Sequence, residues 1–137
     1  MNLSRNQKVL IAALVLTFIL NLLASPPPTG LETRPGTSIK SPAWYGVFAV
    51  LLGVDVVAVA LLFFKPKAAS ILAAIVSILN FVVVLSDQAG LIQPTAPPSP
   101  IFGDEVAIFI VSIVVLLYAS MVYKGTNPKT APPTPAH

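Results

Sequence analysis

Four apolar stretches of about twenty residues each constrain this chain more than any other feature of its sequence. They span roughly residues 8–25, 44–64, 68–86 and 104–123. At a rise of about 1.5 Å per residue, each stretch approaches the ~30 Å thickness of a membrane hydrocarbon core. Only 9% of the residues are charged, whereas a soluble domain carries about 25%. The sequence therefore predicts an all-α polytopic membrane protein with four transmembrane helices.

Local signals mark where these helices start. Ser4 followed by Gln7 fits a capping box ahead of the first helix. Pro66 suits the first turn of the third helix. Asp104 and Glu105 suit the start of the fourth helix, because acidic side chains are favoured at the positive end of a helix dipole. We therefore expect these two acids to cap that helix, with a weak outer cation site as the alternative interpretation.

Basic residues indicate which way the helices face. Six of them belong to the two terminal segments and the second connection, namely Arg5, Lys8, Lys65, Lys67, Lys124 and Lys129. The first connection carries only Arg34 and Lys40, and the third carries none. Because cytoplasmic segments hold the excess of Lys and Arg, this distribution predicts a cell-membrane protein with both termini in the cytoplasm.

Residues 1–125 are expected to form one four-helix membrane domain, followed by a disordered cytoplasmic tail over 126–137. Aromatic residues with a polar tip prefer the membrane–water interface. Trp44 and Tyr45 are therefore predicted to anchor the outer interface, and Tyr123 the inner one.

The chain also reads as one helical hairpin written twice, over residues 6–64 and 65–123. Each half contains an Ile–Leu–Asn sequence, ending at Asn21 and at Asn80. A tandem duplication would give two parallel hairpins related by an axis along the membrane normal. Chance similarity between apolar sequences is the alternative.

Polar side chains interrupt the apolar stretches at similar depths. They are Thr17, Asn21, Asp55, Ser77, Asn80 and Ser112. Because an unpaired polar group facing lipid is costly, we expect these side chains to turn inward and to form a layer near the bilayer midplane.

Small residues form two seams. The second helix carries Gly46, Ala49, Gly53 and Ala60, and the third carries Ser70, Ala73 and Ser77. Since small residues let membrane helices approach closely, both seams are predicted to pack helices. Asp55 lies about 200° around the helix from Gly53. It therefore faces another neighbour, a cavity or a partner protein.

Three interpretations of Asp55 remain open. In the first, Asp55 is a neutral acid, because burial favours the protonated form. It then has a structural role and donates a hydrogen bond to Thr17, Ser77, Asn80 or a backbone carbonyl. In the second it contacts another subunit or a second copy. In the third it is the carboxylate of a proton- or cation-coupled transporter.

Several function classes are disfavoured. The chain has no cysteine, and its one histidine is the last residue, His137. It contains no nucleophile–histidine pair, no cluster of metal ligands and no phosphate-binding glycine loop. We therefore expect no catalysis, no cofactor and no metal. The net charge of +3 indicates topology rather than nucleic-acid binding.

The remaining classes are two. The first is a non-catalytic accessory or structural subunit of a larger membrane complex, whose partners are the lipid bilayer and other membrane subunits or a second copy. The second is a small proton- or cation-coupled transporter or channel that uses Asp55. In length, helix number and a single buried acid the chain resembles the small multidrug-resistance exporters, which work as dimers. Their essential carboxylate lies in the first helix, whereas Asp55 lies in the second.

Overall fold

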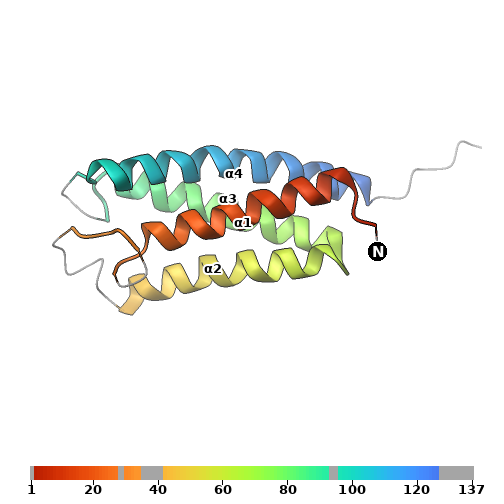
Figure 1. The fold of residues 1–137 in the computed structure, drawn as a ribbon, viewed down its shortest axis with the longest axis horizontal. Coiled ribbons are helices and arrows are strands. Elements are labelled where there is room, and N and C mark those ends of the chain that lie inside the picture. The colour runs from red at the N-terminus through yellow and green to blue at the C-terminus, as the bar shows by residue number, and fades with distance from the viewer. Residues whose placement is uncertain (1, 28–29, 35–41, 93–95, 127–137) are drawn as a thin grey trace, which may run out of the picture.

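The four apolar stretches fold into four helices that run antiparallel to one another in chain order (Figure 1). The computed structural model describes residues 2–27, 30–34, 42–92 and 96–126. The helices are α1 (Arg5–Ala24), α2 (Pro42–Leu62), α3 (Pro66–Gln88) and α4 (Ser99–Gly125). Within those ranges the chain forms no strand, and all four helices are long and apolar enough to cross a membrane. The predicted all-α fold with four transmembrane helices is confirmed. Nearly all of the predicted tail, from residue 127, lies outside the described residues.

The start of α1 follows its local signal. The Ser4 hydroxyl accepts the backbone N–H of Gln7 at 3.2 Å, and the Gln7 side chain accepts the backbone N–H of Ser4 at 2.8 Å. This is the predicted capping box. The Gln7 amide also donates to the carbonyl of Leu62 at 3.1 Å, so the cap of α1 is tied to the last residue of α2.

The start of α4 differs from the prediction. The helix begins at Ser99, after an extended Pro98, and its first turn contains no acidic residue. Asp104 and Glu105 lie in its second turn, so the expectation that they cap the helix was wrong. The physical reason is the proline pair: Pro98 precedes the helix, and Pro100 fits its first turn because its fixed φ angle is already helical.

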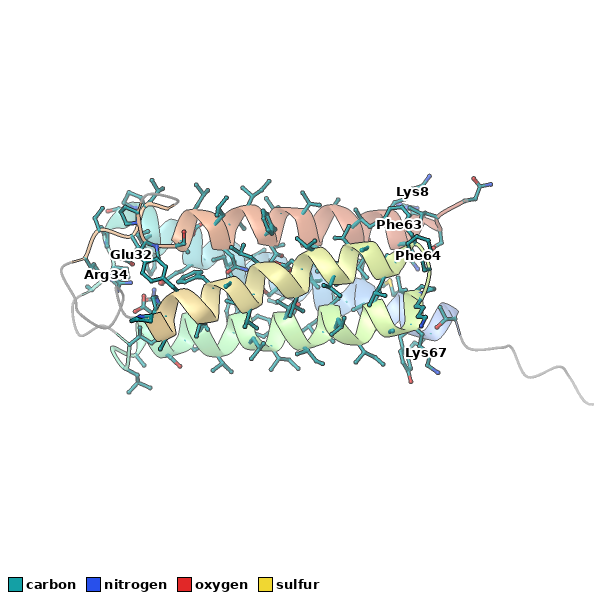
Figure 2. The ribbon with its side chains drawn as sticks, turned by 90° about the horizontal axis from the view of Figure 1, so that it is seen from below. Lys8, Glu32, Arg34, Phe63, Phe64 and Lys67 are labelled. Carbon is teal, nitrogen blue, oxygen red and sulfur yellow. The ribbon has the colours of Figure 1, made fainter. Side chains whose placement is uncertain are left out.

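The helices form a closed ring in which α1 and α3 each pack against both α2 and α4. The start of α1 and the end of α4 lie at the same end of the bundle, which we call the termini end (Figure 1). The starts of α2 and α4 lie at the opposite end, which we call the loop end (Figure 1). Lys8 and Lys67 lie at the termini end, whereas Glu32 and Arg34 lie at the loop end (Figure 2). Both hairpins, α1–α2 and α3–α4, therefore start at the termini end. Whether they are a tandem duplication stays a prediction.

The interior is not uniform along its length. A core of small and branched apolar residues fills mainly the half nearer the termini end, and it comprises Leu10, Ala13, Leu14, Leu51, Ala58, Leu62, Ala69, Ala73, Val76, Val115, Ala119 and Val122. The outer surface is apolar as well, with Val50, Ile78 and Ile110 each more than half exposed. Such a surface suits a lipid bilayer. Polar residues gather in the half nearer the loop end.

Candidate functional site: the polar interior at the loop end

A buried ion cluster lies where the first connection folds over the end of α3. The Arg34 guanidinium binds the Asp87 carboxylate through two parallel hydrogen bonds, Nη1 to Oδ1 at 3.2 Å and Nη2 to Oδ2 at 2.5 Å. Its Nη2 also donates to Oε2 of Glu32 at 2.6 Å, and its Nε donates to both oxygens of that carboxylate at 3.0 Å. All three side chains are buried. Two-pronged pairs of this kind are strong and directional, so the cluster fixes the connection onto α3.

The backbone of the first connection brings Glu32 and Arg34 to this place. The N–H of Leu31 donates to the Leu23 carbonyl at 2.7 Å, and the N–H of Glu32 donates to the Ser25 carbonyl at 3.2 Å. Gly30 makes this return possible, because a Cβ atom built there would lie 1.9 Å from the Ser25 carbonyl oxygen. The chain therefore folds back over the end of α1 only with a glycine at this position.

The charge on Arg34 is held by its partners. Burial acts to lower the pKa of the guanidinium, but its hydrogen bonds with Glu32 and Asp87 outweigh this and raise the pKa above its ordinary value. Arg34 is therefore a permanent cation between two carboxylates.

Glu105 of α4 adds a third carboxyl group. It is buried, it accepts a hydrogen bond from the Gln88 amide, and it lies close to the Asp87 carboxyl group. Three buried acids and a single arginine therefore lie together at the loop end of the bundle.

Sequence reasoning missed this cluster. It used Arg34 only as a marker of orientation and assigned no role to Glu32 or Asp87. A usable signal is present: two opposite charges separated by one residue in the first connection, and an acid at the end of the third apolar stretch, are all predicted at the same membrane face. This signal does not predict which charges pair, because Arg34 and Asp87 meet only in the folded bundle.

A small, partly open cavity lies beneath the cluster. Its lining includes Glu32, Arg34, Asp87 and Glu105 on the loop side, with Asn21 and Asn80 deeper in the bundle. The aromatic side chains of Trp44 and Phe48 line it too, packed edge to face with 5.6 Å between ring centroids. The space open to water-sized molecules is about 30 Å³. The cavity thus joins the charged cluster to the polar layer that the sequence indicates.

The structure buries the whole of that polar layer. Thr17, Asn21, Asp55, Ser77, Asn80 and Ser112 are each at most 2% exposed. The Thr17 hydroxyl donates to the Ala13 carbonyl at 2.9 Å, and the Ser77 hydroxyl donates to the Ala73 carbonyl at 3.0 Å. Both hydroxyls are thus satisfied within their own helices. Neither bonds Asp55, which removes two of the partners that the structural interpretation of Asp55 named.

Other members of the layer lack partners. Among the described residues, no hydrogen bond reaches either oxygen of Asp55, either polar side-chain atom of Asn80, the amide nitrogen of Asn21 or the hydroxyl of Ser112. The Asn21 side chain lies beside the Asp55 carboxylate and interacts with it, but without hydrogen-bond geometry. Unpaired buried polar atoms are rare in folded proteins and point to a bound water or ion.

Asp55 lies between this interior and the outer surface. It also lines a groove of about 190 Å³ between α1 and α2, together with Val15, Phe18, Val56 and Val59. The Asp55 side chain itself is only 1% exposed. The carboxyl group is therefore buried at the inner side of an apolar groove.

The two small-residue seams behave differently. Ser70 and Ala73 are buried within the bundle on α3, whereas the four residues of the α2 seam, Gly46, Ala49, Gly53 and Ala60, are exposed. A Cβ atom built at Gly46 or Gly53 meets no atom within 4 Å. The expectation that the α2 seam packs helices is therefore wrong inside this bundle, because the helix turns Asp55 and its larger apolar residues inward instead.

The predicted interface anchors lie at the two ends. Trp44 is half-buried over the cavity, Tyr45 is exposed near the start of α2, and Tyr123 is exposed near the end of α4. The Lys67 ammonium lies 4.9 Å from the centre of the Tyr123 ring, a cation–π contact. Their role as membrane anchors stays a prediction.

Comparison with protein-family models, with curated proteins and with solved structures found no match. In the part of the chain that the structure describes, no group of three or more His, Asp or Glu side chains could hold a metal ion. The function must therefore be argued from the geometry of the bundle itself.

Proposed function

We propose that this protein is a non-catalytic subunit of a larger membrane complex and that it docks through the outward face of α2. The exposed small-residue seam of that helix carries the proposal. On the positive-inside pattern, the termini end with Lys8 and Lys67 lies in the cytoplasm of a cell membrane, and the Arg34 cluster faces the outside.

The energetics of glycine favour a partner at this seam. A glycine inside a helix costs about 1 kcal/mol relative to alanine, and nothing within the bundle needs the missing side chain at Gly46 or Gly53. Between transmembrane helices, close approach over small residues supplies the van der Waals contact that drives association. Gly46, Gly53 and Ala60 recur every seventh position, the spacing that keeps one line of contact along a left-handed helix pair. The occupant is therefore a transmembrane helix of another subunit.

A bulky residue in the seam is expected to break the complex. In Gly53→Leu, we expect at least a tenfold loss of the partner that co-purifies with the protein in mild detergent, read by blue-native electrophoresis. The unfolding temperature of the purified chain should not fall, since the leucine points away from the bundle. Gly103→Leu is the matched control, because a Cβ atom at Gly103 of α4 also meets nothing within 4 Å. A wild-type chain that migrates only as a monomer, or a complex unaffected by Gly53→Leu, would refute the proposal. A complex of two identical chains would replace the foreign subunit by a second copy.

A second candidate function is proton-coupled transport through Asp55. The observation that favours it is the buried carboxyl group whose two oxygens are not bonded within the described chain. Buried acids of this kind in membrane helices mark ion and proton pathways, and an exporter working as a dimer would use the α2 face twice.

Reconstituted vesicles test this candidate. We expect a pH gradient across proteoliposomes to collapse at least tenfold more slowly with Asp55→Asn than with the wild-type chain, as followed by an entrapped pH-sensitive dye. The amide has the shape of the acid but cannot release a proton, so the unfolding temperature should stay within a few degrees. Unchanged flux in Asp55→Asn would remove this function.

A further inference from the structure

We propose that the loop-side half of the bundle is a hydrated vestibule that carries protons between the outer aqueous phase and Asp55, and that it ends there. The inference rests on the second proposed function, in which the proton on Asp55 drives transport. The vestibule itself can be tested without measuring transport.

Polar side chains follow one another from the loop end to the middle of the bundle. Arg34 and Glu105 line the cavity at its outer side, and Asn80 lines it deeper in the interior. Asn21, from α1, lines the same cavity and interacts with Asp55. From Glu105 on α4 the series passes to α3, then to α1 and then to α2, so it runs through the centre of the ring rather than along one helix.

The unpaired atoms along this series are hydrogen-bond donors and acceptors that can bind water. Both polar side-chain atoms of Asn80 and the amide nitrogen of Asn21 are buried and unbonded within the described chain, and both residues line the cavity. A buried water needs at least two such partners and about 10–15 Å³ of space. The cavity has about 30 Å³, which is room for about two water molecules. Small shifts of the side chains that line it would extend the water chain to Asp55.

The charged groups at the entrance suit protons rather than anions. Among the described residues that line the cavity, the charged side chains are Glu32 and Arg34 of the first connection, Asp87 of α3 and Glu105 of α4. Asn21 of α1 and Trp44 of α2 line it as uncharged polar groups, and Asp55 of α2 lies beside Asn21. Three carboxyl groups against one guanidinium leave an excess of negative charge when all are ionised. A proton arriving from outside first meets these carboxyl groups at the outer side of the cavity. It then passes along bound water past Asn80 and Asn21, and it neutralises the Asp55 carboxylate; release follows the same path in reverse.

The opposite half of the bundle closes the path. Beyond Asp55 toward the termini end, the buried residues on α1 and α2 include Leu10, Ala13, Leu14, Ala58 and Leu62, and those on α3 and α4 include Ala69, Val76 and Val115. Apolar side chains offer water no hydrogen-bond partners, so an interior lined by them stays dry. The vestibule is therefore a half-channel in this conformation.

Single cysteines can map the water directly, because the chain contains none. The probe is Ag⁺, a water-borne ion that binds thiolate, and the unreacted thiol is counted afterwards with a fluorescent maleimide under denaturing conditions. Asn80→Cys and Asn21→Cys place the thiol in the vestibule on two different helices. Ala73→Cys is the matched control, since Ala73 is fully buried two turns away on the same face of α3, in the apolar half.

We expect Ag⁺ to protect Asn80→Cys and Asn21→Cys at least tenfold faster than Ala73→Cys.

Infrared spectroscopy of the intact chain gives a second measurement. The C=O band of Asp55 is assigned by its loss in Asp55→Asn, and it should shift within minutes of transfer to D₂O. Asn80→Leu should slow that shift at least tenfold, and Ser77→Ala should not. Equal Ag⁺ rates at all three sites, or an Asp55 band that exchanges as fast in Asn80→Leu as in the wild-type chain, would overturn the vestibule. If the vestibule is wet but Asp55→Asn leaves proton flux unchanged, the transport function fails and the vestibule stands.

Discussion

Replacing Arg34 by alanine is expected to destabilise the bundle by about 3 kcal/mol, because breaking a buried ion pair by removing one partner typically costs about 3–5 kcal/mol. The substitution leaves the carboxylates of Glu32 and Asp87, which are 3% and 5% exposed, without their cation. The lower end of the range applies because the cluster lies at the end of the bundle beside water. Unfolding in detergent, followed by circular dichroism, measures the change.

Two further variants show that the loss comes from the cluster. Arg5→Ala removes an arginine that is exposed at the start of α1 and should change the stability by no more than about 0.5 kcal/mol. Arg34→Lys keeps the charge but cannot form the two-pronged contact with Asp87, so its stability should lie between those of the wild-type chain and Arg34→Ala. Equal stability of Arg34→Ala and Arg5→Ala would show that the ion cluster does not hold the first connection in place.

The second large effect is expected at Gly30, where alanine should cost about 3 kcal/mol. The added Cβ atom would lie 1.9 Å from the Ser25 carbonyl oxygen and 2.7 Å from that of Leu22. Both are backbone atoms, which cannot move aside as a flexible side chain would. The turn must open, and the segment that carries Arg34 to the end of α3 then loses its position. The same unfolding experiment measures the loss.

Gly103 provides the opposite case. It lies within α4, and a Cβ atom there meets nothing within 4 Å. Gly103→Ala should therefore raise the stability by up to about 1 kcal/mol, because alanine favours the helix more than glycine does. Opposite signs for the two glycine variants are the expected result. A Gly30→Ala variant as stable as the wild-type chain would mean that the first connection does not fold over α1 as described.

Local sequence was sufficient wherever the controlling interaction is local. The capping box of Ser4 and Gln7 formed as predicted, and so did the four long apolar helices, because both depend on residues close together in the chain. The start of α4 was misplaced, since the acids at 104 and 105 suggested a cap whereas the prolines at 98 and 100 set the boundary. The prolines decided the boundary because the proline ring fixes the φ angle, whereas an acidic side chain only favours a position near the helix start.

The sequence by itself determined that this is a membrane protein, how many transmembrane helices it has, and which polar residues are buried in its interior. These features follow from hydrophobicity and helix length, which are set by composition along the chain. Only the tertiary structure decided what those residues face. It turned Gly53 outward and Asp55 inward, it joined Arg34 of the first connection to Asp87 of α3, and it placed Asn21 and Asn80 around one cavity. Helix rotation and loop path depend on the sum of contacts between distant segments, and no local pattern in the chain encodes that sum.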